Sequence, residues 1–148
     1  MTKTLTAAVL AAFATLASAS ADPKATITEL DARLAKIGAP SIKGTDTVAG
    51  KEVPAIHFGT RKINNNFDVV DGIRKSHQAT ATVFVKAGDE FVRVSTQLAR
   101  NAAYEAVSKG QQYCGPIDVL GTAFDACYNP IKDAGGQIIG VTYVGHKK

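Results

Sequence analysis

Arg93 is the residue whose type and position most strongly suggest chemistry in this chain of 148 residues. It lies in the segment FVRVST, residues 91–96, whose alternating side chains predict a β-strand. In that strand Arg93 would share a face with Phe91 and Ser95. A guanidinium presents a planar fork of donors that matches a carboxylate, and it stays charged at physiological pH. Arg93 is therefore predicted to anchor an anionic ligand, with Ser95 as a candidate beside it.

The surroundings of Arg93 decide between a ligand site and a plain surface. A guanidinium turned toward an apolar helix would be a buried charge without a partner, which is strongly unfavourable. We therefore expect Arg93 to face a wet or anion-filled pocket. The sequence leaves one alternative open, a solvent-exposed Arg93 that pairs with Glu90 or another acid.

Cys114 and Cys127 are the two cysteines of the chain. A two-residue turn at Leu120-Gly121 would fold residues 111–129 into a hairpin and place the cysteines opposite each other. Opposed residues lie within disulfide reach, and closing so short a loop contributes about 3 kcal/mol of stability. The alternative is a pair of metal-binding or redox thiols. It is disfavoured because the sequence has no Cys-x-x-Cys motif and no nearby histidine.

The register of this hairpin also sorts its aromatic residues by face. Tyr113 would lie opposite Tyr128, and Phe124 would share their face. Apolar walls with a few polar groups describe a ligand pocket, and they also describe a core whose tyrosines reach the rim. We take Tyr113, Phe124 and Tyr128 as candidate ligand-binding residues, with Tyr143 of the last predicted strand as a fourth.

No other pattern indicates catalysis, a metal or a cofactor. His57, His77 and His146 are far apart, and none has a second histidine or cysteine at ligand spacing. The sequence contains no nucleophile elbow, glycine-rich phosphate loop or haem-attachment motif. Basic residues are scattered in runs of no more than two, which argues against nucleic acid as a partner. We expect neither an enzyme nor a bound metal or cofactor.

Residues 1–21 have the features of a secretory signal peptide. Lys3 precedes an apolar run from Leu5 to Leu16, and the small residues Ala19-Ser20-Ala21 follow as a cleavage site. The run is too short for a stable membrane span, which needs about 20 apolar residues; an uncleaved anchor is the alternative. We expect a mature single domain, residues 22–148, that is periplasmic or secreted and carries no membrane span of its own.

The remaining periodicities predict an α+β domain with a mainly antiparallel sheet. Thr26 and Glu29 have the spacing of a helix-capping box. Residues 41–52 are polar, contain two glycines, and are expected to form a loop. The expected helices are 26–37, 67–75 and 102–109; the expected strands are 53–58, two runs within 79–96 on either side of Ala87-Gly88-Asp89, the hairpin 111–129, and 138–144.

Five ordered segments resemble a known family: VPAIHFG, INNNFDVVD, ATVFVKAGDEFVRVST, AYEAVSKGQQY and YNPIKDAGGQIIGVTYVG. Together they are similar to the single Cache domains of bacterial receptors, in the subgroup written as a fusion of Cache types three and two. The resemblance runs from Val53 to Gly145 and implies a PAS-like sheet of five to six antiparallel strands with an N-terminal helix behind it. It also implies a small ligand on the other face, often a short carboxylate.

The chain departs from the usual owners of such domains, which are chemoreceptors and sensor kinases. It has no recognisable transmembrane or signalling segment, and its connection from Thr96 to Ala103 looks short, so that a pocket-covering loop is trimmed. Two hypotheses follow. The first is a soluble exported domain that binds a small polar or anionic metabolite and presents it to a signalling or transport partner, such as a membrane receptor. The second is a disulfide-stabilised structural or interaction protein that has lost the pocket and acts through self-assembly.

Overall fold

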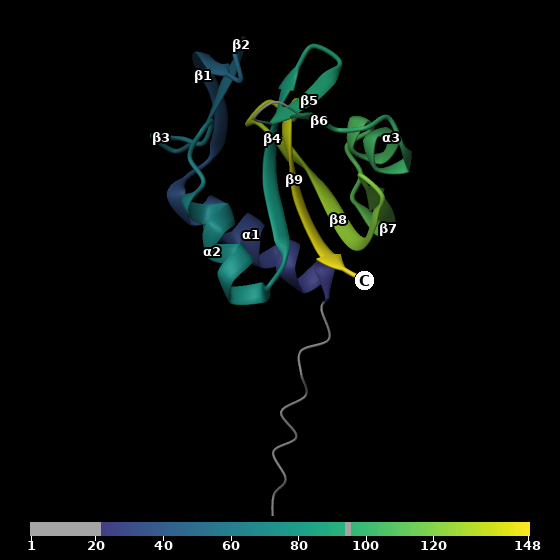
Figure 1. Ribbon diagram of the computed structural model, residues 1–148. Helices are drawn as coiled ribbons and strands as arrows, with labels where there is room; N and C mark the ends of the chain where they lie inside the picture. The colour runs from purple at the N-terminus through teal and green to yellow at the C-terminus, as the bar shows by residue number, and fades with distance from the viewer. Residues whose placement is uncertain (1–21, 94–95) are drawn as a thin grey trace, which may run out of the picture.

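The computed structural model of the protein describes residues 22–93 and 96–148 (Figure 1). The predicted signal peptide and Ser95 lie outside these ranges. In chain order the elements are α1 (Pro23–Ile37), β1 (Pro40–Val48), β2 (Lys51–Phe58), β3 (Arg61–Lys62), α2 (Asp68–His77), β4 (Thr80–Ala87), β5 (Glu90–Arg93), β6 (Thr96–Gln97), α3 (Ala102–Ser108), β7 (Tyr113–Val119), β8 (Thr122–Lys132) and β9 (Ile138–Lys147).

Two antiparallel sheets form the body of the domain. The larger has the strand order β6-β5-β4-β9-β8-β7, and the smaller has the order β1-β2-β3. Figure 1 shows α1, α2 and the smaller sheet on one side of the larger sheet, with α3 on the other side. This is an α+β, PAS-like architecture with the N-terminal helix packed behind a six-stranded sheet, which confirms the predicted fold class.

The smaller sheet corrects the expected loop at residues 41–52. Most of that segment is β1, which pairs with β2 from Pro40 opposite Phe58 to Val48 opposite Lys51. The residues Ala49 and Gly50 make the turn, both with positive φ. Most side chains of β1 are exposed, so the strand has no apolar alternation by which a sequence pattern could reveal it.

The start of α1 also differs from the expected capping box. The helix begins at Pro23, and Asp22 is its cap, because an Asp22 side-chain oxygen accepts a hydrogen bond from the Lys24 backbone N–H at 3.0 Å. The Thr26 hydroxyl donates instead to the Asp22 carbonyl oxygen at 3.0 Å. Glu29 pairs with Arg33 one turn later, at 2.8 Å, so it does not reach back to the helix start.

Two apolar clusters lie on opposite faces of the large sheet. The cluster on the α1 side joins α1, α2 and β2 to the sheet, and Ile27, Leu30 and Ile73 are fully buried in it. The cluster on the other side joins α3 to the sheet through side chains such as Phe91 and Val107. The two faces therefore have separate cores, and α3 covers only part of its own face.

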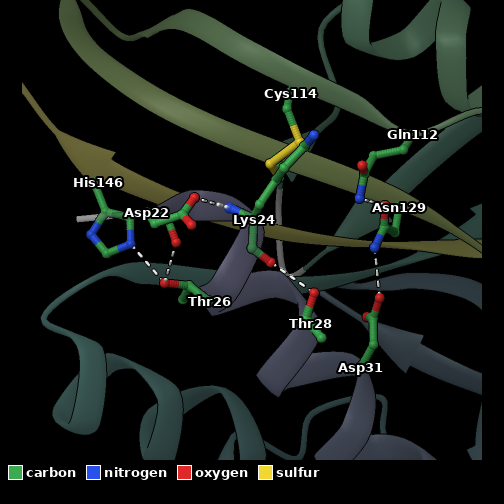
Figure 2. Close-up of a disulfide and its surroundings, with 10 residues drawn as sticks. Asp22, Lys24, Thr26, Thr28, Asp31, Gln112, Cys114, Asn129 and His146 are labelled. Carbon is green, nitrogen blue, oxygen red and sulfur yellow. Dashed lines mark hydrogen bonds between the residues drawn. A yellow bond between two sulfur atoms is a disulfide. The ribbon is translucent and has the colours of Figure 1, made fainter. Parts of the chain in front are cut away.

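The hairpin of β7 and β8 has the register expected from its turn. Cys114 lies opposite Cys127, and Tyr113 opposite Tyr128. Leu120 and Gly121 both have positive φ, as a two-residue hairpin turn with the right twist requires. The cysteines form the predicted disulfide, with a Cα–Cα distance of 4.1 Å (Figure 2).

Candidate functional site

A cavity of about 360 Å³ opens on the face of the large sheet that α1 does not cover. Its floor consists of residues of β4, β9 and β8, and the tip of the β7–β8 hairpin and the start of α3 form part of its rim. Four of the predicted site residues line this cavity: Arg93, Phe124, Tyr128 and Tyr143. Ser95 lies outside the described residues, and Tyr113 is not among the lining residues.

The floor contains a row of hydroxyl-bearing residues that crosses four strands. Thr82 of β4 pairs with Tyr143 of β9, which pairs with Tyr128 of β8, which pairs with Tyr113 of β7. The rings of Tyr128 and Tyr143 have their centroids 4.8 Å apart, and those of Tyr113 and Tyr128 are 6.2 Å apart. Pairing across the sheet thus gathers residues from distant parts of the sequence.

A parallel row of very small residues makes room for the tyrosine rings. Gly145, Ala126 and Gly115 are direct partners across β9, β8 and β7. A Cβ atom at Gly145 would collide with the Tyr143 hydroxyl, and one at Gly115 would lie 3.1 Å from the Tyr113 hydroxyl. These two rings therefore lie over backbone that bears no side chain, which explains why glycine occurs in mid-strand.

The outer two tyrosines of the row have their hydroxyl groups bonded within the protein. Tyr113 donates to the Pro116 carbonyl oxygen at 2.9 Å. The Tyr143 hydroxyl lies 3.0 Å from Thr80 Oγ1, which donates its own proton to the Gly145 carbonyl oxygen. Tyr143 is therefore the donor to Thr80. The Tyr113 ring packs against the side of Tyr128, and of these three tyrosines Tyr128 and Tyr143 line the cavity.

Tyr128 differs from both of its neighbours. Its side chain is 3% exposed, yet its hydroxyl has no hydrogen-bond partner among the described residues. Burial, with the adjacent phenols of Tyr143 and Tyr113, raises the pKa of the hydroxyl, so it keeps its proton. No fully enclosed side-chain polar atom in the described ranges lacks a partner, so this hydroxyl is reached from the cavity. It is a donor available to a ligand.

Arg93 lies at the end of β5, on the face that carries Phe91 and faces away from α1, as predicted. Its side chain is exposed, and its Nη1 donates to Thr82 Oγ1 at 2.8 Å. Burial raises the pKa of Tyr143, and the positive charge of Arg93 opposes this rise. Glu90, the alternative partner considered for Arg93, forms an ion pair with Arg100 at 2.7 Å.

Arg74 is a site residue that the sequence reading missed. It lies in the last turn of α2 and lines the same cavity as Arg93. Its ion pair with Asp71 is long, at 3.8 Å, and both side chains are more than half exposed. Val70 and Arg74 are four residues apart, so a helix puts them on one face. Nothing within the sequence of α2 shows that this face meets β4, so no sequence signal pointed to Arg74.

The histidines have structural roles, in agreement with their scattered spacing. His146 is buried, and its Nε2 lies 2.8 Å from Thr26 Oγ1. His57 contacts the Ala55 carbonyl oxygen, and His77 contacts Ser76. Within residues 22–93 and 96–148, no group of three or more metal-capable side chains comes together. No helix in the part of the chain that the structure describes is long and apolar enough to cross a membrane.

The sequence profile of the Cache 3/Cache 2 fusion domain matches residues 4–148. No curated protein and no solved structure matches the chain. Cache domains are extracytoplasmic domains that bind and sense small molecules. The PAS-like sheet, the helix behind it and the cavity on its other face agree with that description, and the chain belongs to the Cache 3/Cache 2 fusion family.

Proposed function

We propose that the protein binds a small anionic metabolite in the cavity over β4, β9 and β8 and presents it to a signalling or transport partner. The observation that carries this proposal is the buried Tyr128 hydroxyl, which has no partner among the described residues and opens onto a cavity that two guanidinium groups also line. Because this hydroxyl opens onto the cavity, a ligand oxygen can accept its proton in place of water.

The chemistry of the cavity favours a carboxylate over a neutral or cationic ligand. Arg93 and Arg74 supply positive charge, and Tyr128 supplies a neutral donor. Hydrogen bonds from a guanidinium to a carboxylate are charge-assisted and about twice as strong as neutral ones. Phe124 and Ile117 give the cavity apolar walls, and its volume lies at the small end of the range for ligand sites.

The four predicted residues that line the cavity each have a role in this proposal. Arg93 binds the anion, Tyr128 donates to it, and Tyr143 and Phe124 form walls that keep water out. Ser95 remains a prediction from the strand pattern.

We also propose that residues 1–21 are removed on export, so that the mature protein begins at Asp22 outside the cytoplasm. Intact mass of secreted or periplasmic protein tests this, and a mass that retains residues 1–21 would contradict it.

The binding proposal is tested by thermal shift of the oxidised protein against short carboxylates and amino acids. A ligand present at a hundredfold excess over its dissociation constant stabilises the fold by about 2.7 kcal/mol. Tyr128→Phe should reduce the shift, because it removes the available donor. Tyr113→Phe is the matched control, since it deletes a phenol hydroxyl from the same row that is bonded to Pro116 instead. Equal losses in both variants would contradict the proposal.

A second candidate is a structural or interaction protein. The tip of the disulfide-locked hairpin favours it, because Leu120 is 99% exposed there and Val119 is 38% exposed. Leu120 therefore adds nothing to the apolar core, and its positive φ is unfavourable for a residue that carries a bulky side chain. Contact with another protein, or with a second copy, would explain it. No thermal shift with any anion, combined with assembly that Leu120→Asn abolishes, would favour this alternative.

A further inference from the structure

A second cavity, of about 320 Å³, lies on the other side of β4, between the two sheets. It is enclosed by β1 and β2, by α2, and by the α1-side face of β4 and β5. Most of its walls are aliphatic, and these side chains include Val48, Ile56, Ile63, Val70, Val83 and Val85. Phe67, which is 49% exposed, also lines it. A lining in which aliphatic side chains predominate suits an apolar ligand group.

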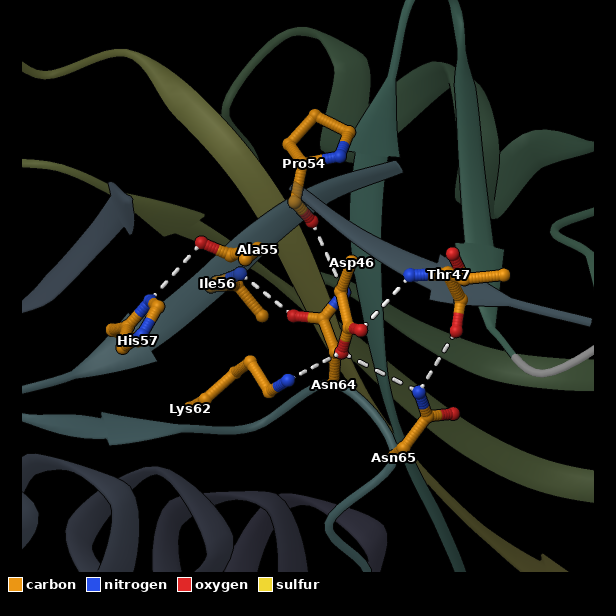
Figure 3. Close-up of polar contacts among 9 residues, drawn as sticks. All are labelled: Asp46, Thr47, Pro54, Ala55, Ile56, His57, Lys62, Asn64 and Asn65. Atoms are coloured by element: carbon orange, nitrogen blue, oxygen red, sulfur yellow. Dashed lines mark hydrogen bonds and ion pairs between the residues drawn. The ribbon is translucent and has the colours of Figure 1, made fainter. Parts of the chain in front are cut away.

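The asparagines that line this cavity are engaged in the protein itself (Figure 3). Asn64 accepts from the Ile56 backbone N–H at 2.7 Å and donates to the Pro54 carbonyl oxygen at 3.0 Å. Asn65 donates to the Thr47 carbonyl oxygen at 3.1 Å, and so ties its turn to β1. These amides tie the turn that contains them to β2 and β1 of the smaller sheet. Arg74 and Arg93 are the charged residues among those that line the cavity.

The two cavities meet at one wall. Both are lined by Arg74, Arg93, Ala81 and Thr82. Ala81 and Thr82 are neighbours in β4, and both lie at the edge that the two cavities share. An anion held by the arginines at this edge would have the tyrosine row on one side and the aliphatic cavity on the other.

We propose that the ligand is an amphipathic monocarboxylate. Its carboxylate lies at Arg93 and Arg74, and its aliphatic chain extends between the sheets into the cavity lined by Val48, Val70 and Val83. This inference rests on the proposed function and narrows the ligand class from short carboxylates in general to those with a medium-length apolar chain. Burial of each methylene group should tighten binding about fourfold.

The test is calorimetric titration of the oxidised protein with acetate, butyrate, hexanoate and octanoate. The dissociation constant should fall about fourfold for each added methylene until the chain fills the cavity, and then stop falling. A dissociation constant that does not change with chain length would overturn the inference while leaving the anion site intact. Failure of every member of the series, acetate included, would overturn the proposed function as well.

Two variants, each of which narrows one of the two cavities, show where the aliphatic chain of the ligand binds. Val83→Phe narrows the cavity between the sheets and keeps a residue type that suits a strand; it should abolish the gain per methylene. Ile117→Phe narrows the other cavity; because Ile117 lines the anion site, it should weaken binding of every acid in the series, acetate included, by the same factor and preserve the gain per methylene. The reverse result would place the chain over the tyrosine row and overturn the inference. If Val83→Phe does not fold, Val48→Phe from the opposite wall of the cavity makes the same test.

Discussion

The two faces of the large sheet use buried polar groups in opposite ways. On the face covered by α1, Asp31 accepts from Asn129 Nδ2 and from Thr142 Oγ1, both at 2.7 Å (Figure 2 shows the Asn129 bond). The side chains of Asp31, Asn129 and Thr142 are thus all bonded within the protein. On the other face the Tyr128 hydroxyl has none among the described residues. The first arrangement fixes a helix on the sheet, and the second leaves a donor available to a ligand.

This comparison predicts that stability and binding can be changed separately. Substitutions of the bonded polar side chains Asp31, Asn129 and Thr142 should destabilise the fold and leave the affinity for an anion unchanged. Substitutions around the tyrosine row should change affinity and leave the fold nearly as stable. The predictions below test this separation.

Loss of the disulfide should have the largest effect. Cys127 is fully buried in the cluster on the α1 face, while Cys114 is exposed. Reduction of the Cys114–Cys127 bond should lower the free energy of unfolding by about 3 kcal/mol, because the reduced unfolded chain is less constrained. Urea unfolding with and without reductant measures this. The variant that combines Cys114→Ala with Cys127→Ala is the control and should not respond to reductant. If the folded, reduced protein also lost affinity for the anion, stability and binding would not change separately.

Arg93 should affect binding and spare the fold. Arg93→Ala should weaken binding of an anionic ligand by about 1.5–3 kcal/mol, the range for a hydrogen bond to a charged group. Arg93→Lys should recover only part of this, since an ammonium cannot form the two-pronged contact. Calorimetric titration measures both. If Arg93→Ala binds the anion as tightly as the wild type, Arg93 is not the anchor.

Asp31→Ala and Tyr128→Phe form a pair with opposite expected results. Asp31→Ala leaves Asn129 and Thr142 without their shared acceptor and should lower stability by about 1–3 kcal/mol. Tyr128→Phe removes a hydroxyl that has no partner in the described chain, and should leave stability unchanged or slightly raised. Urea unfolding compares the two. A larger loss of stability in Tyr128→Phe would contradict the difference between the faces.

The smallest effect is expected from pH. Burial lowers the pKa of His146 from its ordinary value of 6.5, aided by His77 and opposed by Asp22 and Asp125. Just below pH 6.5 the unfolded chain therefore binds a proton more readily than the folded protein does, so stability should fall as the pH decreases through this range. Urea unfolding between pH 7.5 and 5.5 measures the slope. His146→Gln should flatten it, and an unchanged slope would assign it to another group.

The sequence predicted those parts of the fold that follow from local rules. The Leu120-Gly121 turn fixed the register of the hairpin, and through it the Cys114–Cys127 bond and the face shared by Tyr113 and Tyr128. Strand periodicity alone did not separate these two tyrosines. Tyr113 turns its hydroxyl to Pro116 of its own strand. Tyr128 lies between two rings because β8 lies between β7 and β9, an order that no local pattern encodes.

Other features depended on contacts between distant segments. β1 is mostly exposed, so it lacks the alternation that marks a strand. Arg74 reaches the site because α2 packs beside β4, which the spacing within α2 cannot indicate. Pro54 lies in β2, the middle strand of its sheet, although proline has no backbone N–H to donate. Asn64 bonds to the strand beside that proline and takes the place of the missing ladder contacts.

The bond between Thr26 and His146 has a consequence for how the chain folds. The two residues are 120 positions apart, and Asp31 meets Thr142 across 111 positions. The first helix of the domain is therefore secured by the last strand. An isolated helix of 15 residues is marginal in water, and contacts of such long sequence separation form slowly. Docking of α1 should thus be a late step that waits for β9 to be in place.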